Sequence, residues 1–393
     1  MSTLKTLNGN QTIAEAVRQV DPDVMAAYPI TPSTAIVETI AKFKADGLIS
    51  GEFVCPESEH SAMSVCIGAA SAGGRVMTAT ASQGLALMWE MLFIAAGLRL
   101  PIVAGIANRA LSAPINIHGD HSDTMGARDS GWIQIYSENC QEAYDNFIQA
   151  FRIAEHLDVR TPVLVGLDGF IISHSMEVIQ VEEDEKIKEF VGEYQPVYPL
   201  LDTSRKITVG PLDFTDYYFE HKRSQMEGIE NAPGVIQQVG KEYGEKFGRP
   251  YGFFEEYRME DAETCIVVMS SAAGTCKDAI DELRNEGKKI GLLKPRIFRP
   301  FPDKEIAEAL KGLKAVAVLD RSTCPGAFGA PLFTEVRNAL YDYDPRPKVV
   351  NYVYGLGGRD IMVEHFKEVA EKLDKIAETG KVEEMYGYLN LRE

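Results

Sequence analysis

Thr31 and Arg109 are residues of the types that bind a small carboxylic acid. Thr31 stands between Pro29 and Pro32, which restrict the backbone, so its hydroxyl could hydrogen-bond a substrate carboxylate at little ordering cost. Arg109 follows an apolar run, and its planar guanidinium can hold a carboxylate by two parallel hydrogen bonds. The segment around Thr31 is also compatible with an ordinary turn from a strand into a helix, in which a following Ser or Thr is the N-cap.

Glu59 opens a helical stretch of small residues, SAMSVCIGAASAGG, which we expect to be deeply buried. A carboxyl group at the start of such a helix would be partly desolvated, and it could share a proton with a ligand nitrogen. The alternative is that Glu57 or Glu59 merely interacts with the dipole at the helix N-terminus, where acidic residues are common. The neighbouring His60 fits a structural role better than a catalytic one.

Three other segments suit ligand or metal binding less specifically. Ser82, Gln83 and Gly84 form a turn from a strand into a helix, where Gly84 permits close approach of a ligand, but neither phosphate-binding glycine pattern is present. The Gly, Asp and His residues of 119–123 could bind a metal, yet a satisfied loop network is the simpler interpretation, and we assign no metal to this chain. The glycines of 355–358 favour a tight turn before the last helix.

Short apolar runs alternate with helical patterns along residues 22–168, and again from residue 264 onward. This alternation predicts doubly wound, mostly parallel sheets, in which ligands bind beyond the carboxyl ends of the strands. Residues 182–262 differ, because they are rich in Glu, Lys and Tyr and contain turn signals with only weak strand patterns. We therefore expect an α/β protein with a first domain at 1–181, a linker or insertion at 182–262 that wraps it or meets a partner, and a second domain at 263–393.

The chain has 393 residues and a formal net charge of −18. This charge argues against nucleic acid and anionic membranes as partners, because both are bound through clustered Lys and Arg. No apolar run is long enough for a membrane helix, and the N-terminal stretch has neither signal-peptide nor transit-peptide character, so we expect a cytoplasmic protein. The six cysteines include no C-x-x-C pair, so any iron–sulfur cluster must lie on another polypeptide.

In their order along the chain, these motifs resemble one family. YPITPST, ESEHSA, ASQGLALM and NRALSAPINIHGDHSD are similar to the alpha-subunit region of pyruvate:ferredoxin oxidoreductase (pyruvate synthase) and related 2-oxoacid:acceptor oxidoreductases. FRPFP and YGLGGRDI are similar to the second domain of that family, which is related to the C-terminal domain of transketolase. The resemblance covers nearly the whole chain, and the ordered set of motifs is more specific than any one of them.

The resemblance implies that the chain binds the pyrimidine side of thiamine diphosphate. Glu59 matches the glutamate that hydrogen-bonds N1′ of the aminopyrimidine, and Thr31 with Arg109 matches the positions that hold the substrate carboxylate. The residues that the resemblance implies in cofactor binding are Pro29, Ile30, Glu59, Ser82 and Gln83. The first domain would then be the pyrimidine-binding domain, and the second the domain like the transketolase C-terminal domain.

Essential parts of such an enzyme are absent from this sequence. It has no G-D-G…N motif, which binds the metal and the diphosphate in thiamine enzymes. The family implies that Mg²⁺ and the diphosphate belong to a beta-type subunit, and the [4Fe–4S] clusters to a ferredoxin-like iron–sulfur subunit, beside a gamma-type subunit. Coenzyme A would take the acyl group and ferredoxin the electrons. We therefore expect this chain to be inactive by itself.

The sequence leaves open alternatives for the substrate and for the class of function. The loop ALSAPINIHGDHSD is most similar to pyruvate enzymes, whereas relatives that use 2-oxoisovalerate, 2-oxoglutarate or indolepyruvate share YPITP. A second alternative is thiamine chemistry of the transketolase or pyruvate dehydrogenase type, without a ferredoxin acceptor. A third is a noncatalytic structural subunit, against which the intact Thr31, Glu59 and Arg109 argue.

Overall fold

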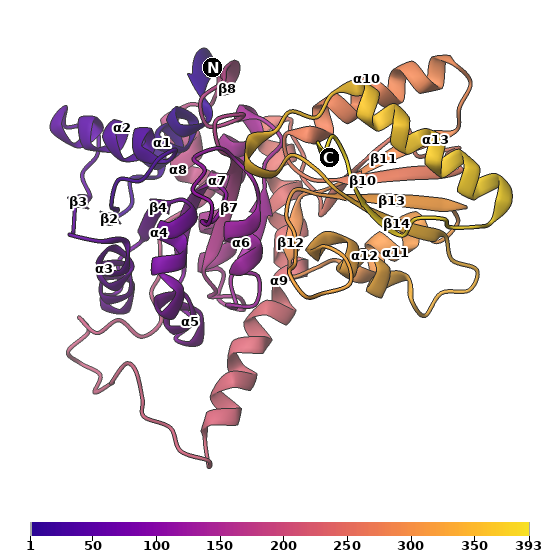
Figure 1. The fold of residues 1–393 in the computed structure, drawn as a ribbon. Helices are drawn as coiled ribbons and strands as arrows, with labels where there is room; N and C mark the ends of the chain where they lie inside the picture. Colours follow the sequence, from indigo (N-terminus) through magenta and orange to yellow (C-terminus); the bar gives the residue numbers. More distant parts are fainter. Residues whose placement is uncertain (1, 393) are drawn as a thin grey trace.

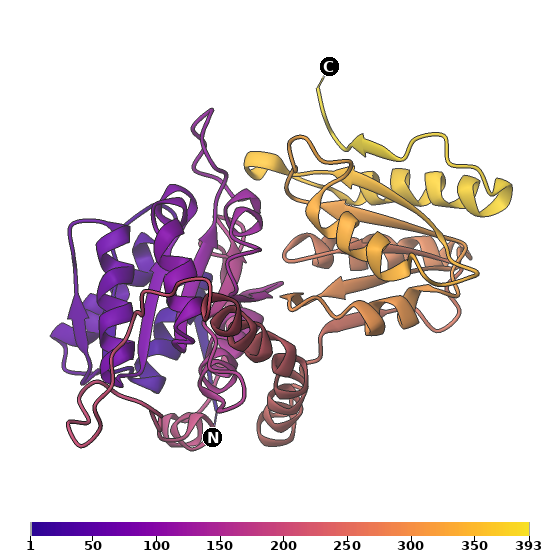
Figure 2. The same cartoon turned by 90° about the horizontal axis from the view of Figure 1, so that it is seen from below.

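The computed structural model describes residues 2–392, which form two α/β units side by side (Figures 1 and 2). The first unit contains a seven-stranded sheet in the order β12-β6-β7-β5-β4-β2-β3, in which only β12 is antiparallel to its neighbour. Its strands are β2 (Val24–Ala26), β3 (Glu52–Val54), β4 (Val76–Thr80), β5 (Ile102–Asn108), β6 (Ile133–Tyr136), β7 (Val163–Asp168) and β12 (Ile297–Arg299). The predicted doubly wound parallel sheet is confirmed.

Helices cover both faces of this sheet, because successive strand residues point to opposite sides. Along β5, Val103 packs into one buried apolar cluster while Ile102 and Ala104 pack into another. The helices of the first cluster are α1 (Gly9–Val20), α2 (Thr34–Ala45), α7 (Cys140–Glu155), α8 (Asp184–Val191) and α9 (Tyr218–Phe247). The helices of the second cluster are α3 (Glu59–Ala72), α4 (Ser82–Leu87) and α5 (Trp89–Gly97). A separate antiparallel ribbon joins β1 (Thr3–Asn8) to β8 (Met176–Val181).

The second unit repeats this three-layer arrangement around a six-stranded sheet in the order β15-β14-β13-β10-β11-β9. Its strands are β9 (Phe254–Tyr257), β10 (Thr264–Val268), β11 (Ile290–Pro295), β13 (Ala315–Asp320), β14 (Lys348–Val353) and β15 (Tyr386–Tyr388). One face packs on α10 (Ala272–Asn285) and α13 (Val363–Thr379). The other packs on α11 (Asp303–Leu310) and α12 (Pro331–Leu340).

Two strands belong to a sheet that their place in the sequence does not suggest. β9 lies inside the predicted linker 182–262, yet it pairs with β11 of the second sheet. β12 lies inside the predicted second domain 263–393, yet it pairs with β6 of the first sheet. Between β11 and β12 only Arg296 separates the two sheets, and its buried guanidinium donates to Asn146 and Gln149 of α7. The domain ranges 1–181, 182–262 and 263–393 therefore remain a prediction, and their boundaries differ from the division of the strands between the two sheets.

The 30-residue helix α9 is the largest element that the sequence did not predict. The segment NAPG at 231–234 has the composition of a turn, but it lies inside the helix, with Pro233 among helical residues. Burial of Ile236 and Val239 in the first unit's core outweighs the poor local propensity. The start of α9 and the segment before it project from the body of the unit (Figure 1). No helix within residues 2–392 is both long and apolar enough to span a bilayer.

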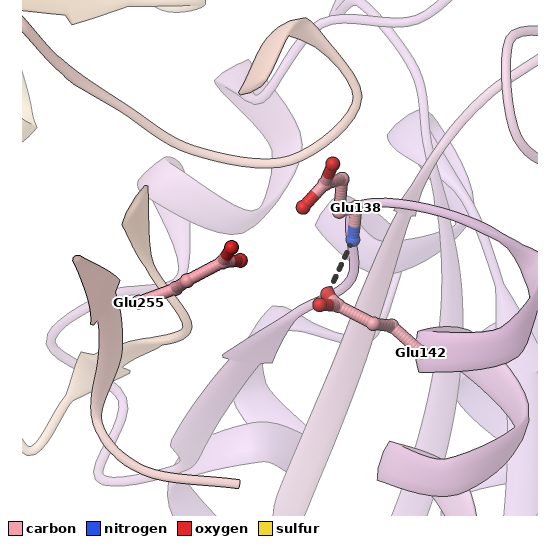
Figure 3. Close-up of side chains that lie close together, drawn as sticks. All are labelled: Glu138, Glu142 and Glu255. Atoms are coloured by element: carbon pink, nitrogen blue, oxygen red, sulfur yellow. Dashed lines mark hydrogen bonds between the residues drawn. The ribbon is translucent and has the colours of Figure 1, made fainter. Parts of the chain in front are cut away.

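An ion-pair cluster joins the two units. Glu138, Glu142 and Glu255 bring their carboxylates together between α7 and β9 (Figure 3). The buried ammonium of Lys294 lies 2.6, 2.5 and 2.9 Å from these three carboxylates, and Lys277 contacts Glu138 and Glu255 as well. Two positive charges thus occupy the centre of the acidic group, which acts as a contact between the units.

A buried carboxylate attaches α9 to the rest of the first unit. Asp145 of α7 is fully buried and accepts hydrogen bonds from the hydroxyls of Tyr243 and Tyr251, at 2.6 Å each. Arg249 donates to the same carboxylate through Nε at 2.7 Å and Nη2 at 3.0 Å. With the Gln141 amide, which donates at 3.1 Å, five donors compensate the loss of hydration of this carboxylate, so Asp145 fixes the C-terminal end of α9 against α7.

Replacing Asp145 with Ala should lower the free energy of unfolding by about 3 kcal/mol, because it leaves a largely buried Arg249 without its main partner. Chemical denaturation of the purified chain, followed by circular dichroism, measures the change. Glu242→Ala is the matched control, since it removes another ion pair between α7 and α9, Arg152–Glu242, that is about one-third exposed. The control should cost less than about 1 kcal/mol. Equal losses in the two variants would contradict this account of α9.

Candidate active site

Four neighbouring strands of the first sheet bring the candidate residues to one edge. The strands β5, β4, β2 and β3 are adjacent and parallel, so their carboxyl ends meet at the same side of the sheet. Thr31 follows β2 and Glu59 begins α3 after β3. Ser82 begins α4 after β4, and Arg109 follows β5 directly.

Glu59 lies at the N-terminus of α3, and it is only 7% exposed. Ser58 is the N-cap of the helix and accepts a hydrogen bond from the backbone N–H of Ser61, so Glu59 is not needed as the cap. Its carboxylate makes no hydrogen bond or ion pair within residues 2–392. A buried carboxylate without a protein partner is costly, and this one is therefore suited to a hydrogen-bond donor on a ligand.

Gly84 of α4 lies directly against the Glu59 side chain. A Cβ atom at position 84 would be 2.8 Å from Glu59 Oε1 and 2.3 Å from the hydroxyl oxygen of Thr80. The sequence predicts that Gly84 permits close approach of a ligand, and in the structure its lack of a side chain also leaves room for the carboxylate of Glu59. This small residue therefore determines where the carboxylate can lie.

Arg109 and Thr31 are in direct contact. The Arg109 guanidinium donates from Nη1 to the carbonyl oxygen of Thr31 and from Nε to the carbonyl oxygen of Asn116, at 2.9 Å each. Burial lowers the pKa of the guanidinium, and the nearby charge of Asp123 opposes this effect. Two of its five N–H groups are used in this way, and the remaining three have no acceptor within residues 2–392. The exposed Thr31 hydroxyl also lacks a partner there, so both groups can bind an oxyanion.

Asp123 fastens the ends of β4 and β5 to each other. Its Oδ2 accepts the backbone N–H groups of Ser82 and Arg109, at 3.0 and 2.9 Å. Its Oδ1 accepts from the side-chain amide of Asn108 at 2.9 Å and from the backbone N–H of Thr124 at 2.7 Å. Burial raises the pKa of this carboxyl to about 6, although the four hydrogen bonds lower it. The sequence left residues 119–123 open to metal binding or to a network of loop hydrogen bonds. The four donors around Asp123 favour the hydrogen-bond network for this residue.

The other sequence-predicted residues lie around the same turns. Ser82 adopts a left-handed backbone conformation, with φ of 45°, and its hydroxyl lies 2.6 Å from the carbonyl oxygen of Ala110 and from Oε1 of Gln83. Pro29 is exposed and Ile30 is half-buried in the segment before Thr31. The Ile30 carbonyl accepts the hydroxyl of Ser33 at 2.8 Å, and the Ser82 side chain likewise bonds within its own loop.

A second buried carboxylate, Asp168 at the end of β7, was not recognised in the sequence. Oδ2 of Asp168 accepts hydrogen bonds from Arg321 Nη1, at 2.9 Å, and from the Ser271 hydroxyl. His121 Nε2 lies 2.7 Å from Oδ1. Burial alone would raise the pKa of Asp168, but the charges of Arg321 and His121 hold it well below its usual range. Since Ser271 and Arg321 belong to the second unit, the cluster locks that unit beside the candidate site. The only sequence signal was the position of Asp168 at the end of the apolar run PVLVGLD.

Family models match most of the chain. A model described as pyruvate flavodoxin/ferredoxin oxidoreductase, thiamine diphosphate-binding, matches residues 15–241. A second model, described as pyruvate:ferredoxin oxidoreductase core domain II, matches residues 262–366. The two matched ranges include every candidate residue named above.

Full-length relatives have similar names. The chain is 55% identical to the pyruvate synthase subunit PorA of Thermotoga maritima, over 98% of both chains. It is 49% identical to the subunit of the same name from Methanocaldococcus jannaschii, over 95% of this chain and 96% of the relative. It is also 43% identical to the ketoisovalerate oxidoreductase subunit VorA of Pyrococcus abyssi, over 99% of this chain and 98% of the relative.

Solved structures share the fold. A 2-oxoglutarate:ferredoxin oxidoreductase from Magnetococcus marinus superposes with a TM-score of 0.73 at 21% identity, over 94% of this chain. This chain spans 65% of the length of that chain. A split-gene transketolase superposes with a TM-score of 0.55 at 11% identity, over 96% of this chain and the whole of the other. Both likenesses concern the fold alone.

The stability contributed by Asp123 should fall as the pH rises from 4 to 6. Its pKa in the folded chain, about 6, lies above the value of about 3.9 for an unfolded Asp, so the folded state binds more protons in this interval. The contribution is fully present below about pH 4 and is lost as the pH rises through about 6, by about 3 kcal/mol in total, of which roughly 2 kcal/mol falls between pH 4 and 6. The measurement is the difference in unfolding free energy between the natural chain and Asp123→Asn, across this pH range. A difference that does not change with pH would contradict the prediction.

Proposed function

Because this chain belongs to the pyruvate flavodoxin/ferredoxin oxidoreductase family, we propose that it is the pyrimidine-binding subunit of an enzyme that oxidises pyruvate with coenzyme A and ferredoxin. The overall reaction converts pyruvate, coenzyme A and oxidised ferredoxin into acetyl-coenzyme A, carbon dioxide and reduced ferredoxin. The full-length relatives named pyruvate synthase subunit support this substrate. Relatives named for ketoisovalerate support 2-oxoisovalerate as the second candidate.

The buried carboxylate of Glu59 is the observation that carries the proposal. It has no partner in residues 2–392, lies at the carboxyl edge of the first sheet and is confined by Gly84, which fits a carboxyl group that shares a proton with a ring nitrogen of the aminopyrimidine of thiamine diphosphate. When bound, thiamine diphosphate supplies the carbon nucleophile and accepts the electrons that decarboxylation releases. Glu59 would share a proton with N1′, which donates to the carboxylate while it holds that proton. A purely structural subunit would have no need of such an unpaired carboxylate.

Arg109 and Thr31 would hold the carboxylate of the 2-oxoacid. The three open N–H groups of Arg109 and the free hydroxyl of Thr31 belong to two residues in direct contact, since Arg109 donates to the Thr31 carbonyl. A carboxylate bound in this way is charge-paired and oriented before it is lost as carbon dioxide. Pro29, Ile30, Ser82 and Gln83 complete the proposed cofactor-binding set around these residues.

The remaining parts of the reaction are proposed to lie on partner chains. The relatives are named as subunits, which supports a multi-chain enzyme. We place the diphosphate and its Mg²⁺ on a beta-type subunit and the [4Fe–4S] clusters on a ferredoxin-like subunit, with a gamma-type subunit beside them. The net charge of −18 favours docking of an acidic ferredoxin on one of these other, more basic chains.

Purification of the complete complex, followed by assays with a panel of 2-oxoacids, tests the function. With coenzyme A, thiamine diphosphate and a viologen dye, pyruvate should be turned over more efficiently than 2-oxoisovalerate or 2-oxoglutarate. A brown iron–sulfur chromophore and viologen reduction would distinguish this chemistry from that of transketolase. Preference for 2-oxoisovalerate would select the second candidate.

The variant Glu59→Gln should leave the complex assembled while its turnover falls by roughly 10²- to 10⁴-fold, because the amide cannot hold the N1′ proton. Size-exclusion chromatography of the complex provides the assembly control. Turnover close to that of the natural complex would rule out this role for Glu59, whatever the substrate.

The variant Gly84→Ala should reduce turnover by about 100-fold, because its methyl group would displace the Glu59 carboxylate from its position. The matched control is Gly68→Ala, in the same helix as Glu59, where an added Cβ meets no atom within 4 Å. The control should keep full activity and stabilise α3 slightly. If both variants have the activity of the natural complex, Gly84 does not determine the position of the carboxylate.

A further inference from the structure

We propose that the glycine turn of the second unit, η1 (Leu356–Gly358), positions the substrate-binding Arg109 through Asn116. The inference rests on the proposed function, because it concerns the arginine assigned to the 2-oxoacid carboxylate. It makes Asn116 and Gly357 positioning residues, which act on the substrate only through Arg109.

Asn116 is bonded to both the arginine and the turn. Its carbonyl oxygen accepts from Arg109 Nε at 2.9 Å, and its side-chain amide donates to the carbonyl oxygen of Gly357 at 3.1 Å. The Asn116 carbonyl is one of only two acceptors that fix the guanidinium within residues 2–392, the other being that of Thr31. A shift of Asn116 would therefore change the direction of the remaining N–H groups of Arg109.

The loop that contains Asn116 has little apolar packing to hold it. Ile115 is 76% exposed and Ile117 is 43% exposed, so burial cannot fix the segment between them. Within the loop, His118 N–H donates to Asn116 Oδ1 at 2.7 Å and Ala110 N–H donates to the His118 carbonyl oxygen at 3.1 Å, and hydrogen bonds from the second unit tie this loop to the glycine turn. The backbone N–H of Gly357 donates to Asp120 Oδ2 at 3.1 Å, and Asp120 Oδ1 accepts the hydroxyl of Ser122 at 2.5 Å.

The turn has to be built from glycine at the point of contact. Gly357 has a left-handed conformation, with φ of 60°, and a Cβ there would lie 2.4 Å from the Asn116 amide nitrogen. The turn is itself held by Arg321, whose Nε donates to the carbonyl oxygen of Gly355 at 3.2 Å. Arg321 also bonds Asp168 of the first unit, so the position of the turn follows the docking of the two units.

The test compares Asn116→Ala with Asn231→Ala in the purified, complete complex. Each replacement removes one side-chain amide that donates to a backbone carbonyl at 3.1 Å, but Asn231 lies on α9 and bonds Asp158, away from the site. Asn116→Ala also removes the acceptor of the His118 N–H, which Asn116→Asp keeps, so a KM raised equally in Asn116→Asp assigns the effect to the contact with Gly357. Asn116→Ala should raise KM for the 2-oxoacid about tenfold. Turnover and KM for coenzyme A should stay within about twofold of the values for Asn231→Ala. Unchanged KM for the 2-oxoacid, or a parallel loss of turnover, coenzyme A affinity and assembly, would overturn the inference.

A double variant separates positioning from general damage. Gly357→Ala alone should also raise KM for the 2-oxoacid, because the new methyl group displaces the Asn116 amide. If both residues act through the same contact, the double variant should have a KM within about twofold of the worse single variant. If the increase in KM of the double variant equals the product of the two single increases, the two residues do not act through the same contact. Failure of the natural complex to turn over any 2-oxoacid would instead reject the proposed function, which is a separate result.

Discussion

The candidate site depends on the buried carboxylate of Asp123. Two adjacent strands end with backbone N–H groups, of Ser82 and Arg109, that the sheet itself cannot satisfy, and one oxygen of Asp123 accepts both. Removing a carboxylate from water is costly, and the four hydrogen bonds to Asp123 offset that cost only in part, as its raised pKa shows. The start of α4 and the first residue after β5 are consequently held at a set separation. The positions of Gly84 against Glu59, and of Arg109 against Thr31, follow from this one junction.

The sequence predicted those features that depend on local pattern. Alternating apolar runs indicated parallel strands, and this placed Thr31, Glu59 and Arg109 at one sheet edge before any role was assigned. The roles themselves came from the resemblance to a family, because a lone Thr, Glu or Arg at a strand end is compatible with ordinary caps and turns. The glycines of 355–358 were understood as a turn, but their contact with the loop of Arg109 joins residues more than 200 positions apart, and no local pattern encodes it.

Other features could not be predicted because tertiary burial overrides local propensity. Helix α9 contains a proline and a turn-like segment, and it exists because its apolar side packs on α7. Asp168 is the last residue of a strand, whereas two of its three side-chain partners, Arg321 and Ser271, come from the second unit. Ser271 follows β10, and Arg321 follows β13. These two strands are neighbours in the second sheet, and the chain adds later strands to one side of β10 first and then to the other. In open α/β sheets this is where ligands bind, and here the carboxylate of the first unit fills the place.

Strand β12 lies in the second unit's part of the sequence but pairs in the first unit's sheet, and this affects whether the first unit can fold alone. β12 covers β6, which is otherwise the outermost strand of the first sheet, although it comes from beyond residue 290 of the chain. A protein cut between the units would leave the backbone groups of β6 uncovered, and an open edge of this kind is a template for pairing with other chains. The edge of the first sheet is thus covered by a strand that lies between two elements of the second unit in the chain, which couples the resistance of the first unit to aggregation to the presence of the second.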